Sequence, residues 1–331
     1  MAANANLHKA KDAKNDEFYT QLTDVSKELM HYKQHFKDKI VFCNCDDPTW
    51  SAFWKYFHLN FEALGLKKLI STHYDKTEPT YKMEYTGGND NDIEAGVKTP
   101  LEGNGDFRNQ ECLDLLDEAD IVVTNPPFSL FREYVAVLME HEKKFLIIGN
   151  GNAVTYKEIF PLIKDNLMWL GVTRQMTGSM WFRIPDDMPD KKGQKIENGV
   201  RYQTIGNSCW FTNLDVQYRH EKIILWKPYN AVDFPKYDNY DAINVDKVSD
   251  IPVDYDGVIG VPITFLGKYN PEQFEIIGGF NGHNCPDEDG GYVSASMTEY
   301  LDKNGKVKNW NGPTINKKTT YYRICIRRKA G

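Results

Sequence analysis

The chain has 331 residues, of which 41% are hydrophobic and 26% charged, and its formal net charge is −7 at pH 7. This is the balance of an ordinary water-soluble globular protein, with length enough for roughly two domains. No apolar run approaches the roughly 20 residues of a membrane span, and the polar N-terminus lacks a signal-peptide core, so we expect a cytoplasmic protein with no membrane partner. The acidic balance counts against a nucleic-acid partner unless basic residues cluster locally.

The six cysteines form no dense framework in a chain of this length. This predicts free thiols in a reducing compartment. Cys43 and Cys45 lie in an apolar run, and His283 and Cys285 are close together, but neither pair has the two further ligands that a zinc site needs. We therefore predict no metal site.

Helix and strand patterns alternate in the first half of the chain. Residues 1–15 lack apolar periodicity, and we expect a flexible tail. The elements predicted next are a helix over 23–36, a strand over 39–43, a helix over 51–64 that ends at Gly65, a strand over 66–72, a strand over 81–85 within the irregular stretch 76–110, a helix over 110–118, a strand over 120–124, a helix over 130–142 capped by Ser129, and a strand over 144–149. This spacing predicts an α/β fold with a doubly wound parallel sheet.

The pattern changes after about residue 165, where strand-like runs are separated by loops rich in Gly, Asn, Asp and Pro. These runs cover 180–184, 208–212, 222–226, 274–278 and 322–326. We expect a catalytic domain over 16–165. Residues 166–331 are expected to complete its sheet and to form a β-rich and loop-rich recognition region.

Asn125-Pro126-Pro127-Phe128 directly follows the apolar run 120–124, which predicts a buried strand. The Asn125 side-chain oxygen and the Pro126 carbonyl can each accept one N–H bond from a planar ring amine. These bonds draw the nitrogen toward tetrahedral geometry, from which it can attack an electrophilic methyl group. The prolines stiffen the loop, and Phe128 offers a flat face for the ring. A rigid turn without chemistry is the alternative, but the preceding strand and the aromatic residue favour catalysis.

Acidic residues follow the first two predicted strands: Asp46 and Asp47 after the first, and Asp75 at the end of the second. Ligands bind outside the carboxyl ends of strands in such sheets, and Asn125 lies at the same edge. Carboxylates there can accept bonds from the ribose hydroxyls of a nucleotide-like donor. No glycine lies in residues 49–52, which counts against a pyrophosphate but not against S-adenosylmethionine. Capping of the next helix is the alternative role for Asp46 and Asp47.

A second candidate donor motif, Gly105-Asp106-Phe107, lies where we expect the third strand to end. Asp106 can accept from the exocyclic amine of the donor's adenine, and Phe107 can stack on that ring. A simple Gly-Asp turn is the alternative interpretation.

Basic residues do cluster locally in the second half. One stretch contains Lys191, Lys192, Lys195 and Arg201, and another covers residues 317–329. The first lies among Gly and Asn residues typical of a loop, and it is our candidate for contacts with nucleic-acid phosphates. A solvated surface is the alternative for either stretch.

Four motifs occur in the order typical of amino-methyltransferases of the gamma arrangement, at residues 16–21, 44–48, 105–107 and 125–128. Over most of residues 16–328 the chain resembles the EcoRI-type adenine-specific DNA methyltransferases. The resemblance implies a Rossmann-like S-adenosylmethionine-dependent methyltransferase sheet. The donor-binding residues that it implies are Phe18, Tyr19, Thr20, Asp46, Asp47, Asp106 and Phe107. Asn125 to Phe128 are implied as the catalytic loop.

Two assignments stay open at this point: which of Asp46 and Asp47 faces the methionine end of the donor, and whether Asp75 or Glu78 is the second-strand acid. The function implied is site-specific N6-methylation of an adenine flipped out of double-stranded DNA. A monomer is favoured. The enzyme is expected to belong to a restriction-modification system, with a cognate restriction endonuclease as a candidate genetic companion, or to be an orphan or phage-borne modification enzyme. The alternatives are N4-cytosine methylation, protein-glutamine methylation, and an inactive nucleic-acid-binding module.

Overall fold

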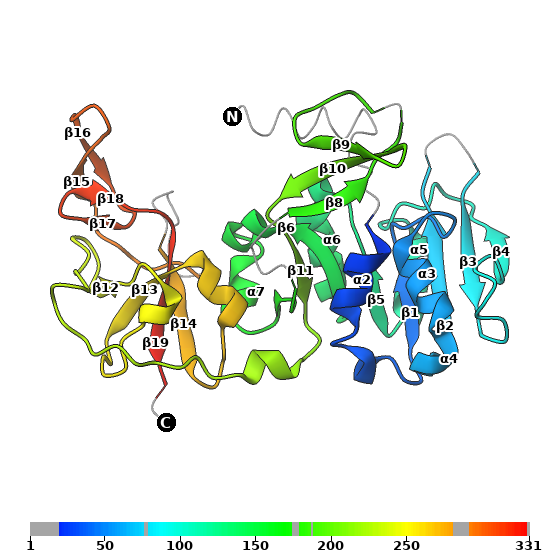
Figure 1. Ribbon diagram of the computed structural model, residues 1–331, viewed down its shortest axis with the longest axis horizontal. Coiled ribbons are helices and arrows are strands. Elements are labelled where there is room, and N and C mark those ends of the chain that lie inside the picture. The colour runs from blue at the N-terminus through cyan, green and yellow to red at the C-terminus, as the bar shows by residue number, and fades with distance from the viewer. Residues whose placement is uncertain (1–19, 76–78, 174–178, 187, 281–290, 330–331) are drawn as a thin grey trace. The chain divides into compact units, whose positions relative to one another are not determined.

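The computed structural model describes residues 20–75, 79–173, 179–186, 188–280 and 291–329 (Figure 1). The chain divides into two compact units. The first is made of Met1–Gly151 and Leu170–Asp215, and the second of Asn152–Trp169 and Val216–Gly331. The expected division into a catalytic and a recognition region is a division by function, and it stays a prediction. None of the helices in the described ranges has the length and apolar character that crossing a membrane requires.

The first unit is built around an eight-stranded mixed sheet with the order β4-β3-β2-β1-β5-β6-β11-β7. The strands are β1 (Ile40–Cys43), β2 (Lys68–His73), β3 (Tyr81–Tyr85), β4 (Val97–Pro100), β5 (Ile121–Thr124), β6 (Lys144–Asn150), β7 (Trp169–Leu170) and β11 (Ser208–Thr212). The pairs among β2, β1, β5 and β6 are parallel. This central part agrees with the predicted parallel sheet.

The predicted parallel sheet is confirmed only in part, because β3 and β11 run in the opposite direction to the central strands. β3 pairs antiparallel with both β2 and β4, and β11 pairs antiparallel with β6. Residues 74–80, which connect β2 to β3, are too few for the crossover that a parallel neighbour needs. The protein is therefore a mixed α/β structure with a large mixed sheet, consistent with a methyltransferase fold.

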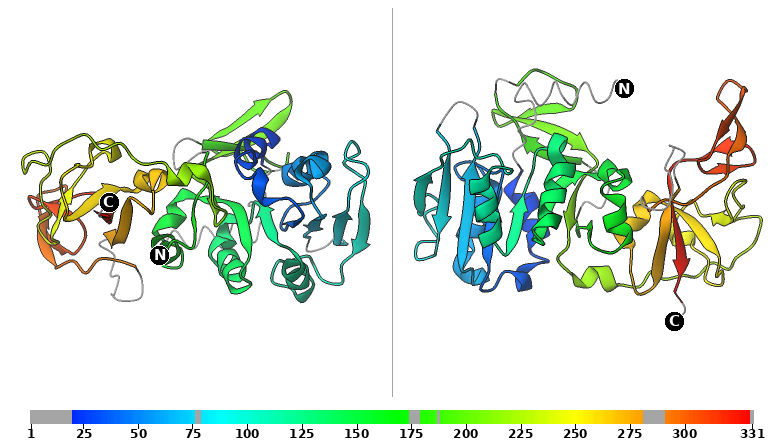
Figure 2. Two further views of the ribbon diagram at one scale, coloured as in Figure 1. Left: turned by 90° about the horizontal axis from the view of Figure 1, so that it is seen from below. Right: turned by 180° about the vertical axis from the view of Figure 1, so that it is seen from behind.

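Helices cover both faces of this sheet, with α2 and α3 on one face and α5 and α6 on the other (Figures 1 and 2). The helical elements of this part of the chain are α2 (Leu22–Leu29), α3 (Ala52–Leu59), α4 (Phe61–Leu64), α5 (Gln110–Glu118) and α6 (Phe131–Glu140), with 3-10 turns η1 (Lys33–His35), η2 (Phe128–Leu130) and η3 (Gly151–Thr155). Every residue of β1 and β5 is buried, as expected for strands covered on both faces.

Three helix predictions need correction. The helix expected over 23–36 ends at Leu29 and is followed by η1. The helix expected over 51–64 is interrupted at Asn60, whose φ of −117° is not helical, although Gly65 does end it in the left-handed conformation. Ser129 does not cap α6, because it lies inside η2, and Leu130 occupies the cap position.

A small antiparallel sheet with the order β8-β10-β9 also belongs to the first unit. Its strands are β8 (Ser179–Arg183), β9 (Gln194–Glu197) and β10 (Val200–Gly206). Met180 and Phe182 are buried on one face, whereas Arg183 is exposed. The strand predicted over 180–184 is thus confirmed, but it belongs to this small sheet and not to the main one.

A buried carboxylate binds the segment with which the chain re-enters the first unit, just after Leu170. Glu28 of α2 is fully buried and accepts hydrogen bonds from the backbone N–H groups of Val172 and Thr173, each at 2.7 Å. The Tyr32 hydroxyl donates to the same carboxylate at 2.9 Å. A side chain on Gly171 would approach Glu28 Oε1 to 2.3 Å, so this close contact requires glycine.

The second unit contains a four-stranded sheet with the order β12-β13-β19-β14. Its elements are α7 (Phe160–Lys164), η4 (Gln217–His220), β12 (Ala242–Asn244), η5 (Val248–Asp250), β13 (Val258–Pro262), η6 (Ile263–Lys268), β14 (Phe274–Phe280), β15 (Thr298–Leu301), β16 (Val307–Trp310), β17 (Thr314–Ile315), β18 (Lys318–Thr319) and β19 (Arg323–Arg328). The strand predicted over 222–226 is wrong. Ile224 and Trp226 are exposed in an extended segment that pairs with no strand of the described chain, so neither burial nor a ladder stabilises one.

Candidate active site

The carboxyl ends of β1 and β5 lie side by side, because the two strands pair in parallel. The Asp46 carboxylate follows β1, and it accepts hydrogen bonds from the Thr124 hydroxyl and, at 3.1 Å, from the Asn125 backbone N–H. Both bonds reach the same oxygen, Oδ2. The structure therefore joins the acidic motif after β1 to the Asn-Pro-Pro-Phe loop at one edge of the sheet.

Asp46 has an unusual protonation equilibrium for an aspartate. Desolvation raises its pKa to about 7, and the nearby Asp47 charge adds to this rise. Hydrogen bonds from Thr124, Asn125 and Ser51 act in the opposite direction but do not compensate. A carboxyl group that titrates near neutrality beside a candidate catalytic loop is typical of functional sites.

Asp47 is held in a different way, by the neighbouring strands. Its carboxylate accepts from the Thr49 backbone N–H at 2.9 Å and from the Tyr81 hydroxyl at 3.0 Å, and His73 Nδ1 lies 3.0 Å from its other oxygen. Desolvation opposes ionisation, but these bonds outweigh it and lower the Asp47 pKa to about 2. The same contact raises the pKa of His73. Asp47 thus stays ionised and links the loop after β1 to β2 and β3.

The loop that carries Gly105-Asp106-Phe107 lies against the end of β2. The Asp75 backbone N–H donates to the Asn104 carbonyl at 3.2 Å. Gly105 has a φ of +73°, and a side chain there would approach the His73 carbonyl oxygen to 2.4 Å. Only glycine fits this approach. The motif does not directly end a third strand, as we expected, but lies in the loop between β4, which pairs with β3 at the edge of the sheet, and α5. Asp75 and Asp106 nevertheless reach the predicted edge.

Asp106 and Phe107 both have partners within the protein. Arg108 donates to the Asp106 carboxylate through Nε at 2.8 Å and through Nη2 at 2.7 Å, and it also bonds to Glu133 of α6 at 2.9 Å. Phe107 is 3% exposed, and its ring lies edge-on to Tyr134 with centroids 4.9 Å apart. The Phe107 ring is therefore used mainly for packing beneath its own loop, against Tyr134 of α6.

The Asn-Pro-Pro-Phe loop continues directly into a helical turn. Pro126 is buried, Asn125 and Pro127 are partly buried, and Phe128 begins η2. The Phe128 ring packs edge-on against Phe182 of β8, with centroids 6.2 Å apart. The small sheet thus contacts the proposed stacking residue of the loop.

Part of the predicted donor site lies outside the described residues, namely Phe18, Tyr19 and the alternative acid Glu78. Thr20 is described and buried. His283 and Cys285 also lie outside. The five described cysteines are free thiols, as predicted. No group of three or more His, Cys, Asp and Glu residues in the described ranges is placed to hold a metal ion.

The four predicted nucleic-acid contacts separate into two kinds. Lys191 and Lys192 are exposed before β9, and exposed Lys195 lies 2.6 Å from Glu197. Arg201 instead donates to the carbonyls of Asp186 and Met188 and to the side chains of Asp190 and Gln194. Arg201 therefore holds this loop in place through its hydrogen bonds. This role was not predicted from the sequence.

Comparison with known proteins adds an independent observation. The family model described as "Adenine-specific methyltransferase EcoRI" matches residues 6–329 of this chain. The chain belongs to the EcoRI family of adenine-specific methyltransferases. The resemblance noted from the four sequence motifs is thereby confirmed.

Three curated relatives of this EcoRI-family methyltransferase are Type II methyltransferases. The chain is 50% identical to M.EcoRI of Escherichia coli, over 83% of this chain and 89% of that protein. It is 37% identical to M.MgeORF184P of Mycoplasma genitalium over 98% of each, and 41% identical to M.MpnI of Mycoplasma pneumoniae over 82% of this chain and 84% of that protein. No solved structure matches the chain.

Several side chains of this methyltransferase's site were missed from the sequence. They are Thr124, which binds Asp46; His73 and Tyr81, which bind Asp47; Arg108, which binds Asp106; and Phe182, which contacts Phe128. No short motif marks them. The one signal available is that Thr124 ends a predicted strand and His73 directly follows one, at the edge where polar side chains meet in this kind of sheet.

Proposed function

We propose that this EcoRI-family enzyme transfers a methyl group from S-adenosylmethionine to N6 of a specific adenine in double-stranded DNA, as the modification enzyme of a Type II restriction-modification system. The observation that carries the proposal is the pair of hydrogen bonds from Thr124 and Asn125 to Asp46. These bonds support a single site, because they join the acidic loop after β1 to the Asn-Pro-Pro-Phe loop. Family membership and the names of the relatives support the acceptor.

The proposed fold is the Rossmann-like methyltransferase sheet. Support comes from the four central parallel strands β2-β1-β5-β6, with helices on both faces. In this arrangement the carboxyl ends of β1, β2 and β5 present Asp46, Asp75 and Asn125 at one edge.

The catalytic loop would act on the acceptor by geometry. The target adenine must leave the stack, at a cost of a few kcal/mol, before its N6 can enter the site. The Asn125 side-chain oxygen and the Pro126 carbonyl then accept the two N6–H bonds and aim the lone pair, while Phe128 stacks on the ring. Bound S-adenosylmethionine supplies a methyl group on a sulfonium, which is a good leaving group. Catalysis is then mainly positioning, and the N6 proton can leave after transfer.

The donor site is proposed from the acceptors at the same edge. Asp47 and Asp75 can accept from ribose hydroxyls, and Thr20, Asp106 and Phe107 would contribute at the adenine end. Arg108 already donates to both oxygens of Asp106. The Arg108 backbone N–H also donates to this carboxylate, at 3.0 Å, so an N–H of the donor's adenine would replace one of these bonds. The residues therefore fit the donor without a phosphate-binding loop.

The decisive test of function is to map modified bases. DNA from cells that express the protein, and from cells that express Asn125→Ala, is sequenced at single-molecule level. We expect N6-methyladenine within one recurring sequence, only with the unaltered protein. Methylation of cytosine N4 would contradict the base assignment, and unmodified DNA would contradict the function.

Removal of the Asp106 carboxylate tests the donor site. Asp106→Ala should weaken S-adenosylmethionine binding roughly 10- to 150-fold, the range expected for one hydrogen bond to a charged group, and leave DNA affinity unchanged. Calorimetric titration with each ligand separately measures both effects. Asp117→Ala, at an exposed carboxylate on α5, is the matched control. Loss of DNA affinity alone would overturn the assignment. Asp47→Ala should act in the same direction, but it also removes bonds from His73 and Tyr81.

The exposed lysines give a separate prediction for DNA binding. Replacing Lys191, Lys192 and Lys195 together with Ala should weaken binding to matched and unmatched duplexes alike. The slope of log K against log[salt] should become shallower by roughly one unit for each phosphate that is no longer neutralised. Lys67→Ala, at an exposed lysine beside the opposite ends of the strands, should leave the slope unchanged. An unchanged slope with altered sequence preference would indicate base contacts, and no change would make the stretch a solvated loop.

The remaining partners are also proposals. Because the relatives are named as Type II enzymes, we propose a companion endonuclease that cleaves the same sequence when it is unmethylated. We further propose that the enzyme acts as a monomer in the cytoplasm. Equilibrium sedimentation of the purified protein would test the monomer.

A further inference from the structure

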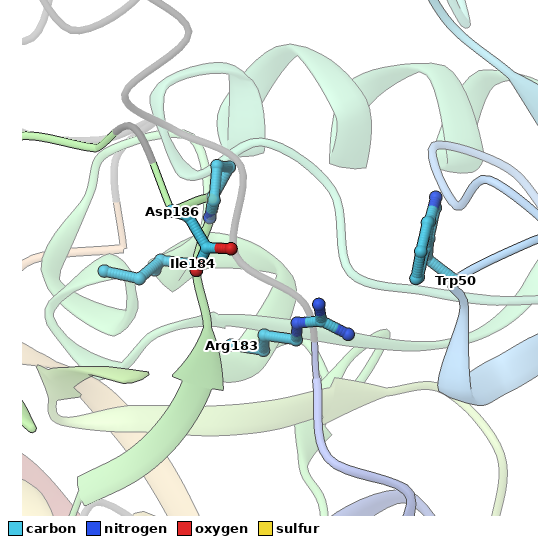
Figure 3. Close-up of a pocket in the computed structure, with 5 residues that line it drawn as sticks. Trp50, Arg183, Ile184 and Asp186 are labelled. Atoms are coloured by element: carbon cyan, nitrogen blue, oxygen red, sulfur yellow. The ribbon is translucent and has the colours of Figure 1, made fainter. Parts of the chain in front are cut away.

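A pocket of about 180 Å³ lies beside the proposed active site, within the first unit, and has no role in the reaction described so far. The residues of the described chain that line it are Trp50, Arg183, Ile184, Pro185 and Asp186. Figure 3 shows the Arg183 side chain extending into the pocket toward Trp50. The volume is below the roughly 300 Å³ at which drug-sized ligand pockets begin. The pocket therefore has room for one small group only.

The two walls of the pocket belong to segments that also form the active site. Trp50 lies in the loop after β1, and its backbone N–H donates to the Asp47 carbonyl at 3.0 Å. Arg183 is the last residue of β8, directly after Phe182, whose ring contacts Phe128. Because successive residues of a strand point to opposite faces, β8 contacts the catalytic loop with one side chain and the pocket with the next. The pocket is thus adjacent to both the donor loop and the catalytic loop.

The chemistry of the lining selects a nucleobase among small planar groups. The Trp50 indole is 53% exposed, and the Arg183 guanidinium lies 5.3 Å from its ring centre. Exposed aromatic rings and guanidinium planes are the surfaces on which proteins stack unpaired bases. The guanidinium can also donate to ring nitrogens and carbonyls of a base, and the Asp186 carboxylate can accept from an exocyclic amine. Arg201 fixes the backbone beneath this carboxylate by bonding to the Asp186 carbonyl.

A phosphate fits this pocket less well than a base. The Asp186 carboxylate would repel a phosphate, whereas Arg183 and Asp186 together offer the donor and the acceptor that the edge of a base requires. A planar indole also adds stacking for a base but little for a tetrahedral anion.

We propose that Trp50, Arg183 and Asp186 form a nucleobase subsite that holds one unstacked base of the DNA substrate beside the catalytic loop. This proposal rests on the proposed DNA methylation. The base is a neighbour of the target adenine in the recognition sequence, because the target itself is proposed to stack on Phe128. Binding of that base would raise the affinity for DNA and help to place the target adenine for methyl transfer. The subsite itself would not contact the methyl donor.

The test uses the whole enzyme and duplexes that carry 2-aminopurine, one position at a time, across the methylated sequence. Fluorescence of this base rises when it leaves the stack and falls when it stacks on an aromatic side chain. Trp50→Ala should change the fluorescence at one position only and should raise the KM for DNA roughly five- to 150-fold, the range of one base–aromatic stack. Trp50→Phe should restore most of the fluorescence signal and most of the KM for DNA, because phenylalanine keeps an aromatic ring. The position that responds identifies the base.

Variants of Arg183 form a second part of the test. They distinguish the effect of the planar guanidinium group from the effect of its positive charge. Arg183→Ala and Arg183→Lys should both weaken DNA binding, because lysine lacks the planar fork. Affinity for S-adenosylmethionine should be unchanged in all these variants. Two controls with exposed side chains, Leu59→Ala at the far end of α3 and Lys67→Ala, should behave like the unaltered protein, and thermal unfolding checks the fold of each.

The outcomes separate this inference from the proposed function. If the unaltered enzyme methylates DNA but Trp50→Ala matches it at every 2-aminopurine position, only the subsite is wrong. A loss confined to S-adenosylmethionine affinity would assign the pocket to the donor and overturn the inference. If Arg183→Lys retains full DNA affinity while Arg183→Ala does not, a phosphate occupies the pocket instead of a base. If no modified adenine is found with the unaltered enzyme, both the function and the subsite fail.

Discussion

Asn125→Ala should reduce the single-turnover rate of methyl transfer about 10²- to 10³-fold, the effect of losing one hydrogen-bonding group aimed at the reacting atom. The side-chain oxygen of Asn125 is the acceptor proposed to aim the N6 lone pair. The bond from Asn125 to Asp46 is made by the backbone N–H, so it survives truncation of the side chain. The fold and the affinity for S-adenosylmethionine should therefore be unchanged.

The measurement compares rates at saturating DNA and S-adenosylmethionine with equilibrium titration of the donor. Asn60→Ala is the matched control, because the Asn60 side chain donates to the Tyr56 carbonyl at the end of α3. A variant that kept more than about a tenth of the rate would contradict the proposed role, given that one such hydrogen bond is worth at least 10²-fold.

Asp46→Asn should make the protein more stable above pH 7 and at the same time less active. The pKa of Asp46 is about 7, against 3.8 for an unperturbed aspartate. Between these two pH values the folded state keeps a proton that the unfolded state has released, so the free energy of unfolding falls as the pH rises. The loss integrates to about 4 kcal/mol by pH 7. An amide cannot ionise, so the variant should match the unaltered protein near pH 4 and exceed its stability at pH 8.

Activity should change in the opposite direction. The Asp46 oxygen accepts from both Thr124 and Asn125, and an amide that turns its NH₂ group toward these donors breaks the link to the catalytic loop. Misplacement of a catalytic group by about 1 Å can cost roughly 10²-fold in rate. Urea unfolding at several pH values and single-turnover rates test the two parts. Asp114→Asn, at an exposed carboxylate of α5, is the control. If the free energy of unfolding depends on pH equally in Asp46→Asn and in the unaltered protein, the raised pKa of Asp46 is contradicted.

The elements that the sequence predicted well are those whose pattern is local. β1, β5 and β6 are short apolar runs, buried throughout except at the ends of β6, and α5 has the bounds expected from its periodicity. Strand direction and strand partners depend on distant residues, so the antiparallel β3 and the separate sheet of β8 were not predictable in this way. The failed strand at 222–226 has the right composition but no partner in the described chain.

The same distinction applies to the site. Asp46 and Asn125 could be found because each follows a predicted strand, and parallel strands bring such ends together. The partners of Asp47 and Asp106 could not, since His73 and Arg108 differ from many other polar residues only by their positions in the folded chain. Arg201 shows the converse: a basic residue in a promising loop whose hydrogen bonds go to that loop.

The burial of Glu28 has a consequence for the order in which this protein can form during synthesis. The N–H groups that satisfy the Glu28 carboxylate come from residues 172 and 173, and β11 joins the main sheet only after them. A nascent chain that ends at residue 151 would leave this carboxylate without those donors and the β6 edge open to other chains. The first unit must therefore wait for residues up to 215 to leave the ribosome. An amino-terminal fragment that ends at residue 151 is therefore a poor substitute for the whole enzyme.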